Sequence, residues 1–192
     1  SPITAKGRKN KAISGQGIVW GSGDGWRPVK KGKMTDGQWK NLLASGGVLN
    51  EEKDIWYPSE MSLRGHIVSD KFNNPQNIQS REDWEESHQW LRPVMVSISM
   101  CKNVLIEDVT FRNSPCWGIH PLMSEDIIVQ NVKVFNPWYS QNGDGLDVES
   151  CNRVVVRDCL FDVGDDAICI KSGKDEDGRK RAMPCRNLVI YN

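Results

Sequence analysis

Two short acidic motifs in the second half of the chain could carry out acid–base chemistry. Residues 142–150 read NGDGLDVES and residues 164–173 read GDDAICIKSG, so the motifs contain Asp144, Asp165 and Asp166. Three carboxylates held close together cannot all ionise easily, so at least one of their pKa values is expected to rise. A protonated acid beside ionised ones is the arrangement that hydrolysis of a glycosidic bond needs.

Turn chemistry or calcium binding could also account for these motifs. Asp-Gly and Gly-Asp-Asp occur in tight turns, where the Asp side chain hydrogen-bonds the local backbone. Clustered aspartates also bind calcium, although calcium sites usually recruit backbone carbonyls and further acids. For one motif alone a turn would be the simpler interpretation, whereas two motifs brought into register favour a functional site.

A repeat in the sequence predicts that the two motifs do lie side by side. Four stretches combine a polar opening with a run of Val, Ile and Leu: CKNVLIEDVTF from 101, SEDIIVQNVKVF from 124, CNRVVVRDCLF from 151 and CRNLVIYN from 185. Their starts are 23, 27 and 34 residues apart, without helical periodicity. This pattern predicts an all-β parallel solenoid whose coils stack about 4.8 Å apart. The alternative is a β-sandwich with similar strands.

Alignment of the repeats assigns a register to each coil. One interior ladder is predicted to stack Val104, Ile127, Val154 and Leu188. The same alignment gives two further sets of equivalent positions, which are Ile119, Leu146 and Ile168, and Trp117, Asp144 and Asp166. Because an unpaired buried carboxylate costs several kcal/mol, about 2 or more, the strand must begin after Asp166. Gly164 to Asp166 would then form a corner, with Gly143 and Gly145 at the preceding one.

Composition excludes several classes of protein. Lys plus Arg and Asp plus Glu number 25 each, so the net charge of zero gives no sign of a nucleic-acid-binding tail. No apolar run is long enough to span a membrane. The six cysteines form no CxxC pair, which argues against a zinc ribbon, and their strand-like surroundings predict buried free thiols rather than disulfides.

The first half of the chain is less regular. Residues 10–21 resemble an early coil, and 34–47 predict a short helix in an inserted loop, with Thr and Asp at its start and Gly at its end. We expect residues 80–93 to form a loop over one face, in which Trp84 and Trp90 anchor the loop or contact substrate. The charged stretch from 173, GKDEDGRKRAMP, is expected to be a solvated loop. The insertions 22–60 and 70–92 could wall off one end of a groove, which slightly favours action at chain ends.

The acidic motifs and their surroundings together resemble a known family. NGD at 142–144 and GDD at 164–166, continued by AICIKSGKD, resemble bacterial members of the polygalacturonase family, glycoside hydrolase family 28. The stretches 113–121, 92–109 and 15–26 are similar to the family as well. The resemblance implies a right-handed parallel β-helix, a single domain over 1–192, that cleaves α-1,4-galacturonosyl bonds of pectic polysaccharide with inversion. It implies no metal and no cofactor.

The resemblance also assigns roles to residues. Asp165 resembles the general acid that protonates the leaving oxygen, and Asp144 with Asp166 resembles the pair that activates water. Asn142 would orient its neighbours by hydrogen bonding. Lys171, Trp117 and His120 complete the predicted substrate-binding residues.

Two later motifs of the family, Gly-His-Gly and Arg-x-Lys, do not appear here. We therefore expect the chain to be the incomplete N-terminal and central part of a longer β-helix, inactive alone if the missing coils are needed. A secreted or periplasmic location is expected from the resemblance. The alternatives are a solenoid that binds pectic sugar without cleaving it, and a calcium-dependent lyase of the same shape.

Overall fold

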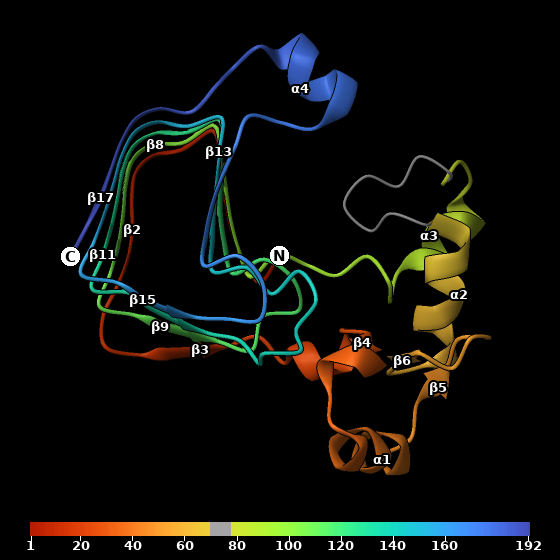
Figure 1. Cartoon of the computed structure of the whole chain (residues 1–192). Coiled ribbons are helices and arrows are strands. Elements are labelled where there is room, and N and C mark those ends of the chain that lie inside the picture. Colours follow the sequence, from red (N-terminus) through yellow and green to blue (C-terminus); the bar gives the residue numbers. More distant parts are fainter. Residues whose placement is uncertain (70–77) are drawn as a thin grey trace.

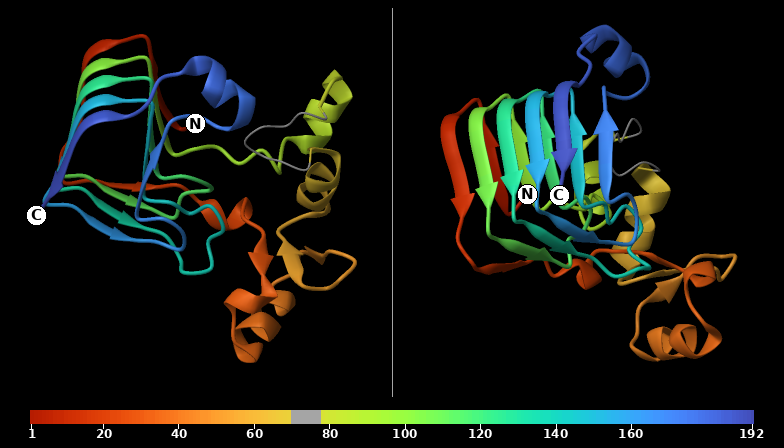
Figure 2. Two further views of the ribbon diagram at one scale, coloured as in Figure 1. Left: turned by 45° about the horizontal axis from the view of Figure 1, so that its top comes forward. Right: turned by 60° about the vertical axis from the view of Figure 1, so that its left-hand side comes forward.

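Three parallel sheets wind into a β-helix in the computed structural model, which describes residues 1–69 and 78–192 (Figures 1 and 2). Sheet A contains β1 (Ile3–Lys6), β7 (Val96–Ser99), β10 (Ile119–Leu122), β13 (Leu146–Glu149) and β16 (Ile168–Lys171). Sheet B contains β2 (Lys9–Ser14), β8 (Lys102–Glu107), β11 (Glu125–Gln130), β14 (Asn152–Arg157) and β17 (Arg186–Tyr191). Sheet C contains β3 (Ile18–Trp20), β9 (Thr110–Arg112), β12 (Lys133–Phe135) and β15 (Leu160–Asp162).

The predicted interior ladders are confirmed. Val104 pairs with Ile127, which pairs with Val154, which in turn pairs with Leu188. On sheet A, residues 119, 146 and 168 are partners in the same way. All pairings in sheets A, B and C of the described residues are parallel, so the β-sandwich alternative, which needs antiparallel sheets, is wrong.

The polar residues that follow each aliphatic run form the corners between sheets B and C. Asp108, Asn131 and Asp158 have left-handed backbone, with φ of 62°, 49° and 54°. Asn and Asp adopt this conformation more readily than most residues, which explains why they recur at this position. The Asn131 amide also donates a 2.7 Å hydrogen bond to the Asp108 carboxylate, which ties one corner to the next.

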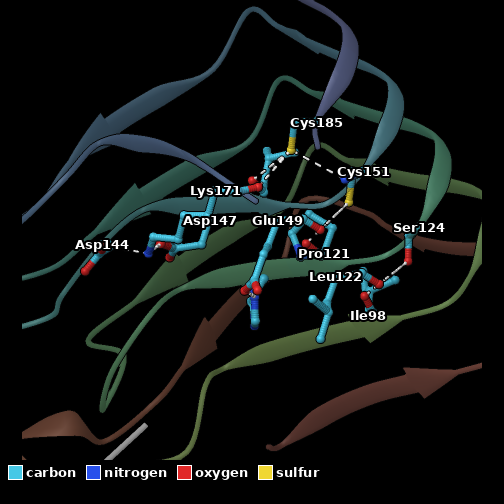
Figure 3. Close-up of polar contacts among 12 residues, drawn as sticks. Ile98, Pro121, Leu122, Ser124, Asp144, Asp147, Glu149, Cys151, Lys171 and Cys185 are labelled. Carbon is cyan, nitrogen blue, oxygen red and sulfur yellow. Dashed lines mark hydrogen bonds and ion pairs between the residues drawn. The ribbon is translucent and has the colours of Figure 1, made fainter. Parts of the chain in front are cut away.

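All six cysteines are free, as predicted, and Cys101, Cys116 and Cys151 are buried. Cys101, Ser124, Cys151 and Cys185 stack at the corner between sheets A and B, where Figure 3 shows three of them. The backbone N–H of Cys101 donates to the Ser124 hydroxyl at 2.9 Å, and that of Cys151 to the Cys185 sulfur at 3.4 Å. These thiols therefore act as small corner residues in the structure.

The long insertion between β3 and β7 folds into structure of its own, to one side of the coil (Figure 1). The predicted helix is α1 (Asp36–Ala44); Thr35 caps it in a capping box with Gln38, and Gly46 and Gly47 follow with positive φ. A small antiparallel sheet of β4 (Val29–Lys30), β6 (Ile55–Tyr57) and β5 (Val48–Leu49) packs Trp56 near Trp39. The predicted early coil at 10–21 is confirmed by β2 and β3.

Two segments expected to be loops contain helices instead. Residues 80–93 include α3 (Arg81–Ser87), which begins with a capping box between Ser80 and Asp83 and lies beside α2 (Glu60–Ser69). Trp90 is buried and stacks on His66 at 4.1 Å, whereas the Trp84 side chain is 52% exposed. The charged insertion contains α4 (Asp175–Arg181), stabilised by acids in its first turn and bases in its last.

Both helices lack an apolar stripe, which is the usual signal of a helix, so their charged sequences did not predict them. The first eight residues of the insertion 70–92 lie outside the described residues. Across residues 1–69 and 78–192, no helix is long and apolar enough to cross a membrane.

Candidate active site

The three aspartates predicted from the two motifs meet on one corner of the coil. Asp144 lies two residues before β13, and Asp165 and Asp166 lie just before β16. One carboxylate oxygen from each lies within 4.8 Å of the other two. Asp144 is only 4% exposed, whereas Asp165 and Asp166 are exposed to solvent. The arrangement is one buried carboxyl group beneath two that a polymer could reach.

Backbone hydrogen bonds between coils fix this register. The N–H of Gly118 donates to the carbonyl of Asp144, and the N–H of Gly145 donates to the carbonyl of Asp166, both at 2.9 Å. The strand begins at Ile168, after Asp166, as the cost of burying that carboxylate predicted. The register therefore brings residues 117, 144 and 166 onto adjacent coils, as the repeat predicted.

The corner glycines are needed because the coils approach so closely. A Cβ atom at Gly145 would lie 2.5 Å from the carbonyl oxygen of Ala167. A Cβ atom at Gly164 would lie 2.2 Å from the carbonyl oxygen of Pro137. Neither site has room for a side chain, so glycine sets the spacing that brings Asp144 to the Asp165–Asp166 pair.

Asp165 is held by two backbone donors. The N–H of Asn142 donates to its Oδ2 at 2.9 Å, and the N–H of Asp166 donates to its Oδ1 at 3.2 Å. The Asn142 side-chain oxygen accepts from Arg92 at 2.9 Å, and Arg92 also donates to the Gln141 carbonyl at 2.7 Å. Arg92, which is buried and which the sequence did not reveal as part of the site, thus holds the loop that orients Asp165.

An ion pair that the sequence did not reveal, between the partly buried Lys171 and the buried Asp147, lies beside Asp144 (Figure 3). Asp147, on β13, is 0% exposed, and its Oδ1 accepts a hydrogen bond from the Lys171 ammonium. The same ammonium lies 3.7 Å from Asp144 Oδ2 and 3.8 Å from the centre of the Trp117 ring. Lys171 is therefore bound by protein groups on three sides. Leu146 and Val148 pack in the core, so strand alternation places Asp147 on the outer face of sheet A, and no signal in the sequence predicted its burial.

Burial raises the pKa of both inner carboxyl groups. Loss of hydration raises the pKa of Asp147 to about 7, against the hydrogen bond from Lys171. Loss of hydration also raises the pKa of Asp144, which the Lys171 charge opposes and Asp165 reinforces. The pKa of Asp144 is therefore raised, as expected for one member of the cluster, but burial is the main cause and the neighbouring Asp165 a smaller one.

The raised pKa of Asp147 predicts a pH dependence of stability. The folded protein holds a proton on Asp147 that the unfolded chain releases near its ordinary pKa of about 3.9. This contribution is complete below about pH 4 and is lost as pH rises toward about 7, at about 1.4 kcal/mol per pH unit. Urea unfolding at several pH values should show a shallower decline in Asp147→Asn than in the wild type. Asp36→Asn, far along the chain on α1, should decline as the wild type does, and equal slopes in all three proteins would contradict the prediction.

A cavity of about 580 Å³ is lined by sheet A residues and by α4; the three aspartates do not line it, but its residue Lys171 lies 3.7 Å from Asp144. It brings together Trp117, His120 and Lys171, which the sequence had grouped as substrate-binding candidates. Glu149 accepts from His120 at 2.9 Å and from Arg181 at 2.8 Å, and these hydrogen bonds lower its pKa. Lys171 and His120 both lie against the Trp117 ring, so the ring is partly covered within the protein.

The same three aspartates also offer the type of ligand that calcium prefers. Carboxylate oxygens within 4.8 Å of one another also suit calcium, although exposed acidic groups often lie together without an ion. Hydrolysis and calcium binding would both use the three neighbouring carboxyl groups at this surface corner.

Comparison with known proteins finds one family. Residues 77–183 match the family described as glycosyl hydrolases family 28. The chain is 31% identical over 184 residues to an exo-poly-alpha-D-galacturonosidase of Dickeya chrysanthemi, covering 96% of this chain and 28% of that protein. A probable polygalacturonase of Vitis vinifera is 34% identical over 111 residues, covering 56% of this chain and 23% of that protein.

Comparison with solved structures gives a similar result. A crystal structure of a hyperthermoactive exopolygalacturonase from Thermotoga maritima superposes with a TM-score of 0.64 at 31% identity, covering 98% of this chain and 38% of that one. The chain spans about a quarter of the length of the two curated relatives above. The family match extends over more than half of the chain, from 77 to 183, and includes all three aspartates. The chain therefore belongs to glycosyl hydrolase family 28.

Proposed function

We propose that the protein hydrolyses α-1,4-galacturonosyl bonds of pectic polysaccharide by general acid–base catalysis. The observation that carries the proposal is the convergence of Asp144, Asp165 and Asp166, with an oxygen of each within 4.8 Å of the others. Membership of family 28 and relatives named as polygalacturonases support the substrate class.

The roles follow from exposure and from the family resemblance. Asp165 is exposed and fixed by two backbone donors, so it is placed to protonate the oxygen of the leaving sugar. Asp144 and Asp166 lie beside it and activate the attacking water. The raised pKa of Asp144 competes with this assignment, because a carboxyl group that keeps its proton is better suited to be the acid. The variants compared in the Discussion separate the two assignments.

Membership of family 28 supports inversion, whereas the distances between the aspartate oxygens do not. Inverting hydrolases usually separate acid and base by about 6.5–9.5 Å to leave room for water. The nearest oxygens of the three aspartates are closer than this, within 4.8 Å. We propose direct displacement, which inverts the anomeric carbon. Proton NMR tests this by identifying the configuration of the first anomer released.

The products of one incubation test the function. With polygalacturonate, the protein should release new reducing ends with inverted configuration and no unsaturated sugar absorbing in the ultraviolet. A chelator should leave the rate unchanged, because the proposed chemistry needs only carboxyl groups. Unsaturated, calcium-dependent products would instead indicate a lyase, retained configuration would contradict inversion, and binding without product would indicate a sugar-binding solenoid.

The proposal also includes further coils of the β-helix and a secreted or periplasmic location. The last strands of sheets A and B expose apolar side chains, with Ile170 at 55%, Val189 at 54% and Tyr191 at 51% exposure. An exposed strand edge of this kind favours pairing with another strand. Further coils of the same β-helix domain would cover this edge and supply additional substrate contacts. A secreted or periplasmic location would bring such an enzyme to its polymer.

A further inference from the structure

Two buried carboxyl groups, those of Asp144 and Asp147, lie beside the exposed Asp165 and Asp166. Asp144 is 4% exposed and Asp147 is 0% exposed, and the same Lys171 ammonium lies against both, hydrogen-bonded to Asp147 and 3.7 Å from Asp144. Among the described residues, Asp144 Oδ1 and Asp147 Oδ2 lack any hydrogen-bond donor. A buried acceptor without a donor is costly, and two facing carboxylates add like-charge repulsion. A single proton held between the two groups would remove both penalties.

The second oxygen of each of the two carboxyl groups faces the Lys171 ammonium, at different distances. Asp147 Oδ1 accepts from the Lys171 ammonium, whereas Asp144 Oδ2 is 3.7 Å from it, beyond hydrogen-bond distance. The Trp117 ring, 3.8 Å from Nζ, confines the ammonium further. Lys171 is therefore held mainly by Asp147, which keeps it from bonding directly to Asp144.

We propose that Asp147 is a positioning residue for Asp144: its protonated carboxyl group donates a hydrogen bond to Asp144 while its other oxygen holds Lys171. The donated bond opposes the rise in the Asp144 pKa that burial causes, and it fixes the orientation of Asp144 toward the water. The inference rests on the proposed function, in which Asp144 serves as a base. Without Asp147, the Lys171 ammonium would be free to pair with Asp144 and occupy it.

The charged groups around Asp144 and Asp147 are consistent with a proton held between the two carboxyl groups. The titratable and charged groups that act on Asp144 and Asp147 are Lys171 and Cys169 on β16, Asp165 before it, Cys116 before β10 and Arg92 before β7. Of these, Lys171 provides the ion pair with Asp147. A proton shared between Asp144 and Asp147 would reduce the negative charge that remains between the two carboxyl groups beside this ion pair.

Two substitutions at Asp147 test the inference. In Asp147→Asn, the amide N–H can replace the donor to Asp144 and the amide oxygen can accept from Lys171, so kcat should stay within about threefold of wild type. In Asp147→Ala, both contacts are lost, and kcat should fall by about 10²-fold or more through misplacement of Asp144. Asp36→Asn and Asp36→Ala on α1 serve as the matched remote pair, with no difference expected. Equal activities of Asp147→Asn and Asp147→Ala would overturn the inference.

The pH profile separates positioning from a purely structural role. The wild-type rate should decline above about pH 7 as Asp147 loses the proton that it donates. Asparagine cannot lose its donor, so Asp147→Asn should keep its rate to higher pH. An unchanged alkaline limb in this variant would overturn the inference.

Carboxyl NMR gives a readout that does not depend on activity. With 13C-labelled aspartate, one resonance should titrate near pH 7 in the wild type and be absent in Asp147→Asn, which also covers the case in which Asp147→Ala does not fold. A protein inactive on every pectic substrate, with this resonance present, would contradict the proposed function and leave the hydrogen bond standing. Absence of the resonance in the wild type would overturn the inference itself.

Discussion

Asp165→Asn should reduce kcat on polygalacturonate by about 10²–10⁴-fold while leaving the fold and substrate binding intact. The amide is nearly the same size as the carboxyl group and cannot donate a proton to the leaving oxygen. Its oxygen can still accept a hydrogen bond from the backbone N–H of Asn142, which lies 2.9 Å from the native Oδ2. The measurement is the release of reducing ends under saturating substrate.

A substrate with an activated leaving group distinguishes the acid from the base. An aryl galacturonide whose phenol leaves without protonation should restore much of the activity of Asp165→Asn, but not that of Asp144→Asn. Asp158→Asn, the same substitution at a remote corner where asparagine tolerates the φ of 54°, should behave as wild type. Recovery of Asp144→Asn in place of Asp165→Asn would transfer the acid role to Asp144, in line with its raised pKa.

Gly145→Ala should lower both activity and stability because the new methyl group has no room. Its Cβ would lie 2.5 Å from the Ala167 carbonyl oxygen and 2.6 Å from the Phe161 ring. The coil that carries Asp165 and Asp166 would have to move away from Asp144. Overpacking of this kind costs about 1–3 kcal/mol, and a displacement of about 1 Å at a catalytic group costs about 10²-fold in rate. Urea unfolding and kcat/KM measure the two effects.

The matched control is Gly17→Ala in the first coil. Among residues 1–69 and 78–192, no heavy atom beyond the chain neighbours lies within 4 Å of a Cβ there, so stability and rate should change little. Similar losses at both glycines would mean that the close approach at Gly145 does not set the geometry of the site.

The sequence predicted the coils and the convergence of the aspartates because both depend on local, repeated signals. Each aliphatic run alternates inward and outward residues, and parallel stacking then aligns equivalent positions, as with Val104 and Ile127. The placement of Asp144 beside Asp166 followed from that register. The cost of burying a carboxylate correctly predicted the exposure of Asp166, but the same expectation for Asp144 is wrong, because Asp144 is 4% exposed.

What the sequence could not reveal depends on partners from distant segments. The burial of Asp147 arises from Lys171 on the next coil, and Arg92 comes from a segment 50 residues before Asn142. Helices α3 and α4 were missed because caps and end charges stabilise them, whereas an apolar stripe is the usual signal. The capping box at Ser80 was the available signal for α3.

The pairing of the first coil has a consequence for how the molecule assembles. Ile3 pairs with Val96 across the whole excursion that holds α1, α2 and α3, whereas Val96 pairs with Ile119 only 23 residues on. Closing a long loop costs more chain entropy than closing a short one, and contacts between distant residues form slowly. The three successive windings from β7 to β16 therefore form a natural folding nucleus, and the strands before residue 21 pair with it afterwards.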